Sequence, residues 1–278
     1  MGACGRPPRR HVPLGRRVSE TFDAIAATLE PGGDSEYFRF HRARFAQQLA
    51  SLEQVAPKGA RVLDIGSHYL HMSVALAARG FAVTGLDVAA FQQIEFVRRR
   101  AATARLQCET VTDLGRGDFL QAAGNDAFDV IVFCEIMEHI TFNPVAFWRR
   151  VHALLRPGGF VYVSTPNSLR LTNVIKTAAR LLGRRGVGIP VGEILKYVTY
   201  GHHWKEYSAT EMREYFARLS PDFAVEVRFV DYGFEGPRAA TAVRAIGSLV
   251  PSLSPHIEAF VRLPKKTAWT AQPRGYED

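Results

Sequence analysis

One segment of the chain, from Val62 to Asp87, has the pattern of a strand, a turn, a helix and a second strand. It reads VLDIGSHYLHMSVALAARGFAVTGLD, with apolar runs at 62–65 and 82–86 on either side of a helical stretch. An acidic residue closes each apolar run. The pattern predicts one βαβ unit of a parallel, nucleotide-binding sheet.

The turn after the first of these strands is the predicted cofactor site. Gly66 allows a sharp turn that leaves backbone N–H groups free at a helix start, and Asp87 follows at the distance typical of a ribose-binding acid. His68, Tyr69 and His71 occupy positions where a dinucleotide fold requires small residues. Their side chains would crowd a pyrophosphate, so the loop favours an adenosine cofactor without phosphates, such as S-adenosylmethionine.

The rest of the chain continues the alternation of strands and helices. Helices are predicted at 19–29 and 35–52, before the first strand. Further predicted strands lie at 107–112, 128–133, 159–164, 223–230 and 257–263, and further predicted helices at 89–104, 144–155, within 168–199, at 208–219 and near 238–249. This order predicts an α/β fold with a doubly wound sheet.

Composition narrows the function classes. The 278 residues carry a formal charge of +8, but aromatic residues are not interleaved with the basic clusters, which argues against a nucleic-acid partner. No apolar run reaches the roughly 18 residues of a membrane span, although peripheral contact with a membrane stays open. Cys4, Cys108 and Cys134 have no metal or disulfide spacing, which favours a reduced, cytoplasmic setting.

Five segments in this order resemble the class I S-adenosylmethionine-dependent methyltransferases. They are VLDIGSHYLHMSVALA, VTGLD, FDVIVFCEIMEHI, LRPGGFVYVSTPN and GHHWKEYSATEMREYF. The third resembles the E-x-x-E-H segment of the branch that acts on small molecules. The resemblance implies a Rossmann-like, doubly wound, seven-stranded and mostly parallel sheet with an antiparallel last strand. N-terminal helices and a helical insertion after the fifth strand complete the expected fold.

The resemblance also implies a set of cofactor-binding residues. Asp87 would bind the ribose hydroxyls with Val88 beside the adenine, and Asp113 with Leu114 would contact the adenine amino group. Asp118 with Phe119 is the alternative for that last role. The methionine part of the cofactor would contact residues at the ends of the first and fourth strands: Asp64, Gly66, Ser67, His68, Cys134 and Glu135.

Three histidines are the candidates for removing a proton from the acceptor, because the pKa of imidazole lies near neutral pH. His139 follows the predicted fourth strand, and His202 and His203 lie in GHHWKEY. Glu135 and Glu138 could share one face, but no Asp-Asp or Asp-Asn pair accompanies them. We therefore expect no metal ion.

These features predict O-methylation of a small-molecule, natural-product, glycan or lipid-linked acceptor. Methylation of RNA or protein is the second enzymatic alternative, and a degenerate fold that only binds or regulates is the third. The expected organisation is a disordered basic tail (1–18), a helical cap (19–56), a methyltransferase domain (57–266) with a lid insertion (168–206), and a C-terminal tail (267–278). The sequence leaves the oligomeric state open.

Overall fold

A single seven-stranded sheet forms the centre of the computed structural model, which describes residues 15–233, 246 and 249–273. The strand order is β3-β2-β1-β4-β5-β7-β6. The strands are β1 (Arg61–Ile65), β2 (Ala82–Val88), β3 (Gln107–Val111), β4 (Phe128–Cys134), β5 (Leu155–Pro166), β6 (Ala224–Val230) and β7 (His256–Arg262). Only β7 runs antiparallel to its neighbours β5 and β6. The expected Rossmann-like sheet with its antiparallel last strand is confirmed.

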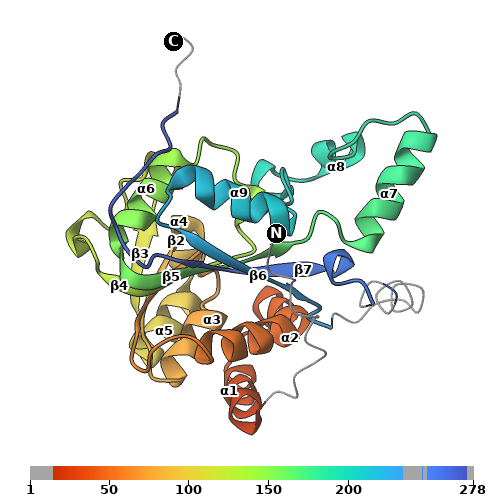
Figure 1. Ribbon diagram of the computed structural model, residues 1–278. Helices are drawn as coiled ribbons and strands as arrows, with labels where there is room; N and C mark the ends of the chain where they lie inside the picture. Colours follow the sequence, from red (N-terminus) through yellow and green to blue (C-terminus); the bar gives the residue numbers. More distant parts are fainter. Residues whose placement is uncertain (1–14, 234–245, 247–248, 274–278) are drawn as a thin grey trace.

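Helices cover both faces of this sheet (Figure 1). One face carries α1 (Arg16–Ala26), α2 (Gly33–Glu53), α3 (His71–Ala78) and α5 (Glu95–Ala104), and the other carries α6 (Val145–Leu154) and α9 (Ala209–Leu219). The apolar core therefore has two main parts, one on each face of the sheet. Phe22, Leu49 and Leu76 pack on the first face, whereas Trp148 and Phe216 pack on the second. The central strand β4 is buried along six of its seven residues, as expected for a parallel strand covered on both sides.

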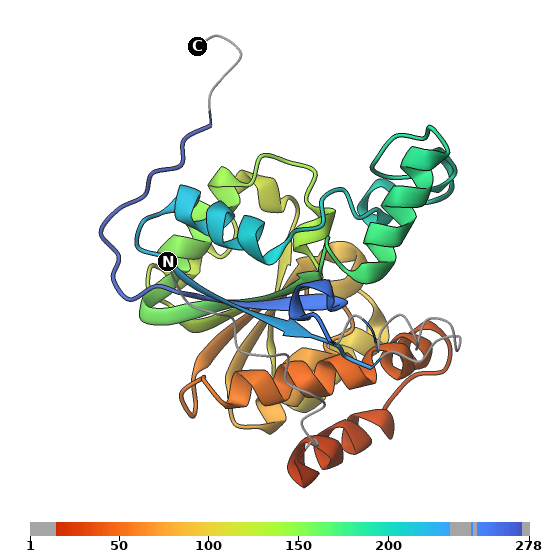
Figure 2. The ribbon, with the colours of Figure 1, turned by 45° about the vertical axis from the view of Figure 1, so that its right-hand side comes forward.

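The helical insertion after β5 projects from the second face. It consists of α7 (Leu171–Leu182) and α8 (Val191–Lys196), and Figure 2 shows α7 extending away from the sheet edge. Within the part of the chain that the structure describes, no helix is long and apolar enough to cross a membrane.

Several predicted boundaries differ from the structure. The first helix begins at Arg16, inside the expected tail, because Val18 packs into the core. The predicted helix 89–104 is two helices, α4 (Ala89–Gln92) and α5, separated by the extended residue Ile94. Pro144 is the N-cap of α6 rather than its first residue. Of the helix predicted near 238–249, only Ile246 and Leu249 lie among the described residues.

Candidate active site

The predicted cofactor loop follows β1 and turns without the glycines typical of such loops. Gly66 has φ of 77°, and a Cβ there would lie 2.4 Å from the side chain of Ile136. His68 (φ 49°) and Leu70 (φ 65°) also adopt left-handed conformations, which L-residues other than glycine take at a cost of about 1–2 kcal/mol. The loop therefore retains the turn although two of its positions carry large side chains.

Contacts from other elements hold this strained loop in place. Arg100 on α5 donates to the Tyr69 carbonyl at 2.7 Å and also binds both carboxylate oxygens of Asp34. Asp34 in turn pairs with Nε2 of His71 at 2.8 Å. The Leu70 side chain is fully buried against α5. Burying a leucine stabilises the fold by roughly 2 kcal/mol, which offsets its left-handed backbone.

The loop borders a small pocket of about 40 Å³ between β1, β4 and α2. Its lining includes five of the predicted cofactor-binding residues: Asp64, Gly66, Ser67, His68 and Cys134. The remaining lining residues come mostly from α2 and were not predicted as ligands: Tyr37, Arg44, Phe45, Gln48, Tyr69, His71 and Met72. The carboxyl ends of β1 and β4 thus lie where the crevice rule for open α/β sheets places a ligand.

Burial shifts the ionisation of the acids beside this pocket. Loss of solvent raises the pKa of Asp64 to about 6, although Ser73 Oγ donates to its carboxylate at 2.5 Å. Burial also raises the pKa of Asp87, whose Oδ2 accepts from the His68 N–H at 2.6 Å. A nearby positive charge would stabilise the ionised form of both carboxyl groups. The pocket is therefore suited to a cationic ligand.

Arg44 supplies the fixed positive charge of the pocket. This side chain is buried on α2, and Nη1 lies 3.4 Å from Oε2 of Glu135. Ser164 Oγ donates to the other Glu135 oxygen and accepts from Gln48 Nε2, both at 2.8 Å. Glu135, which has φ of 55°, is thus held by strand β5 and by α2. No sequence signal linked Arg44 to Glu135, because 91 positions separate them.

Polar atoms around the pocket remain available to a ligand. Among the described residues, four buried lining atoms lack a hydrogen-bond partner: Arg44 Nε, Gln48 Oε1, His68 Nδ1 and His71 Nδ1. Buried polar groups are normally paired, so each unpaired atom calls for an explanation. Donors and acceptors beside two carboxylates fit the ammonium and carboxylate of a methionine group.

The residues predicted to contact the adenine do not line this pocket. Asp113 is exposed, and its Oδ1 accepts from the Gly115 N–H at 2.8 Å. Neither Asp113 nor Leu114 is among the described residues that line the pocket. Of the alternative pair, Asp118 is exposed and Phe119 packs in the core. Val88 is exposed at the end of β2.

A second group of polar side chains lies on the opposite face of β5. Consecutive residues of a strand point to opposite faces, so Ser164 contacts Glu135 while Thr165 Oγ1 donates to Glu138 Oε2 at 2.9 Å. The Glu138 side chain is 1% exposed. Burial, followed by the nearby charge of Glu135, raises its pKa to about 8.

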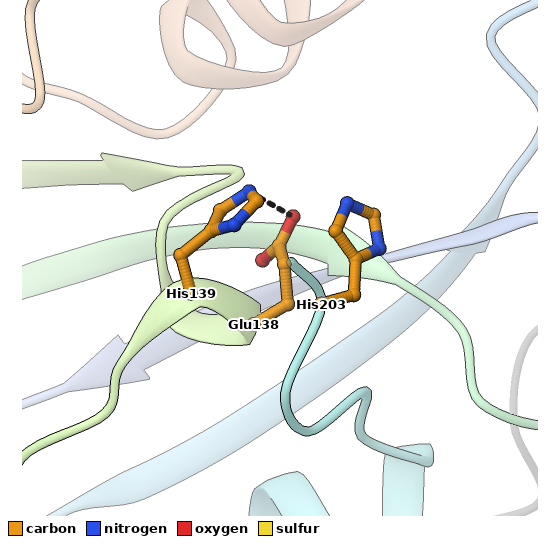
Figure 3. A group of neighbouring side chains, drawn as sticks. All are labelled: Glu138, His139 and His203. Carbon is orange, nitrogen blue, oxygen red and sulfur yellow. Dashed lines mark ion pairs between the residues drawn. The ribbon is translucent and has the colours of Figure 1, made fainter. Parts of the chain in front are cut away.

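His139 and His203 lie beside Glu138, as Figure 3 shows. Their rings are 4.9 Å apart, and Nε2 of His139 lies 4.0 Å from Glu138 Oε1. The segment 202–206 reaches this position because the Trp204 N–H donates to the Glu138 carbonyl at 2.7 Å. His202 is buried, and its ring packs between Tyr197 and Trp204. Two of the three predicted histidines therefore come together.

Similarity to known proteins agrees with this architecture. Residues 36–226 match a family described as methyltransferase domain. An ubiquinone biosynthesis O-methyltransferase of Caulobacter vibrioides is 31% identical over 167 residues, which cover 58% of each protein. One of Pseudomonas aeruginosa is 34% identical over 125 residues, covering 41% of this chain and 48% of that protein. The chain thus spans about half the length of such relatives.

Solved structures share the fold at lower identity. A chain from the Haloferax volcanii complex of the Trm112 methyltransferase activator with a methyltransferase superimposes with a TM-score of 0.59, at 18% identity, over 88% of this chain and 98% of that one. Phosphoethanolamine N-methyltransferase 2 of Haemonchus contortus, solved with S-adenosyl-L-methionine, gives 0.52 at 17% identity, over 79% and 52%. Sheet order, loop position and family match agree: the chain belongs to the methyltransferase-domain family, within the class I S-adenosylmethionine-dependent methyltransferases.

Proposed function

We propose that this chain transfers the methyl group of S-adenosylmethionine to a hydroxyl oxygen of a small-molecule acceptor. One observation carries the proposal. Cys134 at the end of β4 lines the pocket that suits the cofactor, and Glu138 and His139 of the cluster with His203 follow it in the turn after that strand. A methyl donor in the pocket and an acceptor hydroxyl at the cluster would therefore be neighbours.

The cofactor would be held by residues on both sides of the loop. Asp64 and Asp87 offer carboxylates, and Arg44 and Gln48 offer a cation and an amide from α2. S-Adenosylmethionine supplies a methyl carbon on a positively charged sulfur: the acceptor oxygen bonds to this carbon, and the C–S electron pair stays on sulfur. The acceptor must also lose its hydroxyl proton. The chain's own groups for that task are those of the cluster.

The acceptor is proposed to carry a large apolar part. The insertion helices expose apolar side chains to an unusual degree, with Leu182 at 86%, Val191 at 73% and Leu195 at 82%. Exposed apolar patches of this kind mark interaction surfaces. The Caulobacter and Pseudomonas relatives are named for ubiquinone biosynthesis, which favours an acceptor with an apolar chain over a glycan.

Calorimetric titration with S-adenosylmethionine and S-adenosylhomocysteine tests the cofactor part of the proposal. We expect micromolar binding that is weakened at least tenfold in Asp87→Ala. Incubation with labelled cofactor and a panel of phenols and catechols, with and without apolar chains, then tests the acceptor. Absence of binding to both ligands would leave the degenerate-fold alternative. Transfer to RNA or protein but not to any phenol would favour the other enzymatic alternative.

A further inference from the structure

The cluster of Glu138, His139 and His203 has an arrangement that proton transfer alone does not need. One potential ligand atom from each residue lies within 4.8 Å of those of the other two. Two ligand atoms bound about 2.1 Å from one ion lie roughly 3 to 4 Å apart, so shifts of about an ångström or less would bring all three into a coordination sphere. Figure 3 shows the three side chains converging on one point between the turn after β4 and the 202–206 segment.

Hydrogen bonds on the outer side of each ligand orient it toward that point. Nδ1 of His139 lies 3.0 Å from the His202 carbonyl, which can only accept, so Nδ1 carries the proton and Nε2 keeps a lone pair. Nδ1 of His203 lies 2.9 Å from the Glu206 carboxylate, with the same result. In metal sites the imidazole ligand typically donates its other N–H to a carbonyl or carboxylate.

Further hydrogen bonds hold Glu206, the partner of His203, in place. Arg170 forms two hydrogen bonds with Glu206, at 2.6 and 2.9 Å, and Asn173 donates a third at 2.6 Å. These three contacts fix the position of the Glu206 carboxylate, which therefore holds the ring of His203 in one orientation.

The carboxylate of Glu138 supplies independent evidence for a bound cation. Its Oε2 is bonded to Thr165, but its Oε1, on a side chain only 1% exposed, has no hydrogen-bond partner among the described residues. An unpaired buried carboxylate oxygen costs several kcal/mol unless a cation or a proton satisfies it. This oxygen is the one that faces Nε2 of His139.

We infer that Glu138, His139 and His203 form a site for a first-row divalent transition-metal ion. Two imidazoles and one carboxylate favour zinc, manganese or iron over magnesium or calcium, which prefer oxygen ligands only. Three protein ligands leave coordination positions open, and a hydroxyl bound there would lose its proton more readily. The inference rests on the proposed function for its role in methyl transfer. It departs from our expectation of no metal, which considered only Glu135 and Glu138.

Metal binding by the full chain, prepared without a polyhistidine tag and stripped by chelator, tests the site directly. We expect one equivalent of Mn²⁺ or Zn²⁺ to bind by calorimetry, with Zn²⁺ the tighter. The electron spin echo spectrum of bound Mn²⁺ should show modulation from imidazole nitrogen. Glu138→Gln and His203→Ala should each weaken binding at least tenfold. His203 is on the surface, so its variant reports on the site even if the buried Glu138 variant folds poorly.

His152→Gln is the matched control, because His152 lies on α6 between Phe223 and Trp269, away from the cluster. Absence of stoichiometric binding, or equal binding by wild type and His203→Ala, would overturn the inference. Cofactor titration of the same metal-free protein separates the two proposals. Cofactor binding without metal binding would refute only the metal site, whereas metal binding without cofactor binding would refute only the proposed function.

Discussion

The backbone N–H of His68 donates a 2.6 Å hydrogen bond to Oδ2 of Asp87, which joins the loop after β1 to the acid at the end of β2. The second oxygen of this carboxylate accepts from the Val88 N–H at 2.7 Å. Asp87 therefore has two tasks: it fixes the cofactor loop and, by our proposal, contacts the cofactor.

Replacing Asp87 with Asn should separate these tasks. The amide oxygen of Asn can accept only one of the two hydrogen bonds that Asp87 now accepts. A neutral amide is also a weaker acceptor than a carboxylate for a hydroxyl donor. We expect cofactor affinity to fall about tenfold or more, equivalent to about 1.4 kcal/mol. The free energy of unfolding should fall by about 1 kcal/mol, because the amide can accept only one of the two backbone hydrogen bonds. Calorimetry measures the first and a melting curve the second. Glu109→Gln, an exposed acid on the neighbouring strand β3, should leave affinity unchanged; unchanged affinity in Asp87→Asn would contradict the assignment.

Leu70 permits a prediction about backbone strain. In most places alanine is tolerated better than glycine, but Leu70 has φ of 65°, where glycine carries no penalty. Both substitutions lose the buried leucine side chain, at about 2–5 kcal/mol. We expect Leu70→Gly to be more stable than Leu70→Ala by about 1 kcal/mol. Urea unfolding measures the difference.

Val97 on α5 provides the control, since it packs against Leu70 from inside a helix. There the usual order should hold, with Val97→Ala more stable than Val97→Gly. If alanine is the better residue at both positions, the left-handed conformation of Leu70 is not a property of the folded protein.

The buried Asp64 predicts a pH dependence of stability. Its pKa is raised to about 6 in the folded state by burial, against 3.8 in the unfolded chain. The folded state therefore binds the proton more tightly, and the stabilisation is present below about pH 4 and lost as the pH rises through 6. Asp64→Asn should abolish this pH-dependent contribution to stability. Between pH 5 and pH 8, wild type should lose about 1 kcal/mol of unfolding free energy relative to the variant; a pH-independent difference would contradict the shift.

Glu206 should control the protonation of His203. The hydrogen bond that His203 donates to the Glu206 carboxylate raises the pKa of His203 above its usual 6.5. In metal-free Glu206→Gln protein the imidazole loses its anionic partner, so we expect its pKa to fall. Titration followed by NMR of the imidazole protons measures the change. Glu214→Gln, on the exposed side of α9, should not move the pKa of His203.

The sheet could be predicted from the sequence because its strands are short local segments, most of them apolar, with their own turn signals. The order of the strands follows from the resemblance, whereas helix boundaries differ from the prediction where packing decides them, as at Val18 and Ile94. Asp64, Gly66, Ser67 and His68 could be placed together because they are consecutive in one turn.

Other parts of the site depend on contacts between distant residues. Arg44 reaches Glu135 from a helix that carries no cofactor motif, and its role follows only from the packing of α2 on the sheet. His203 was chosen by its type, but its approach to Glu138 depends on the Trp204 backbone, 66 positions after Glu138. Asp113 is not among the described residues that line the pocket, and its contact with the adenine stays a prediction.

The hydrogen bond from Trp204 to Glu138 fastens the chain immediately after the insertion to the turn after β4. Residues between Asn173 and Tyr197 can consequently change in length and composition while His203 stays beside its partners. By our proposal, acceptor preference and proton removal then depend on separate segments of the chain. A change confined to the insertion would alter the acceptor and leave the reacting groups in place.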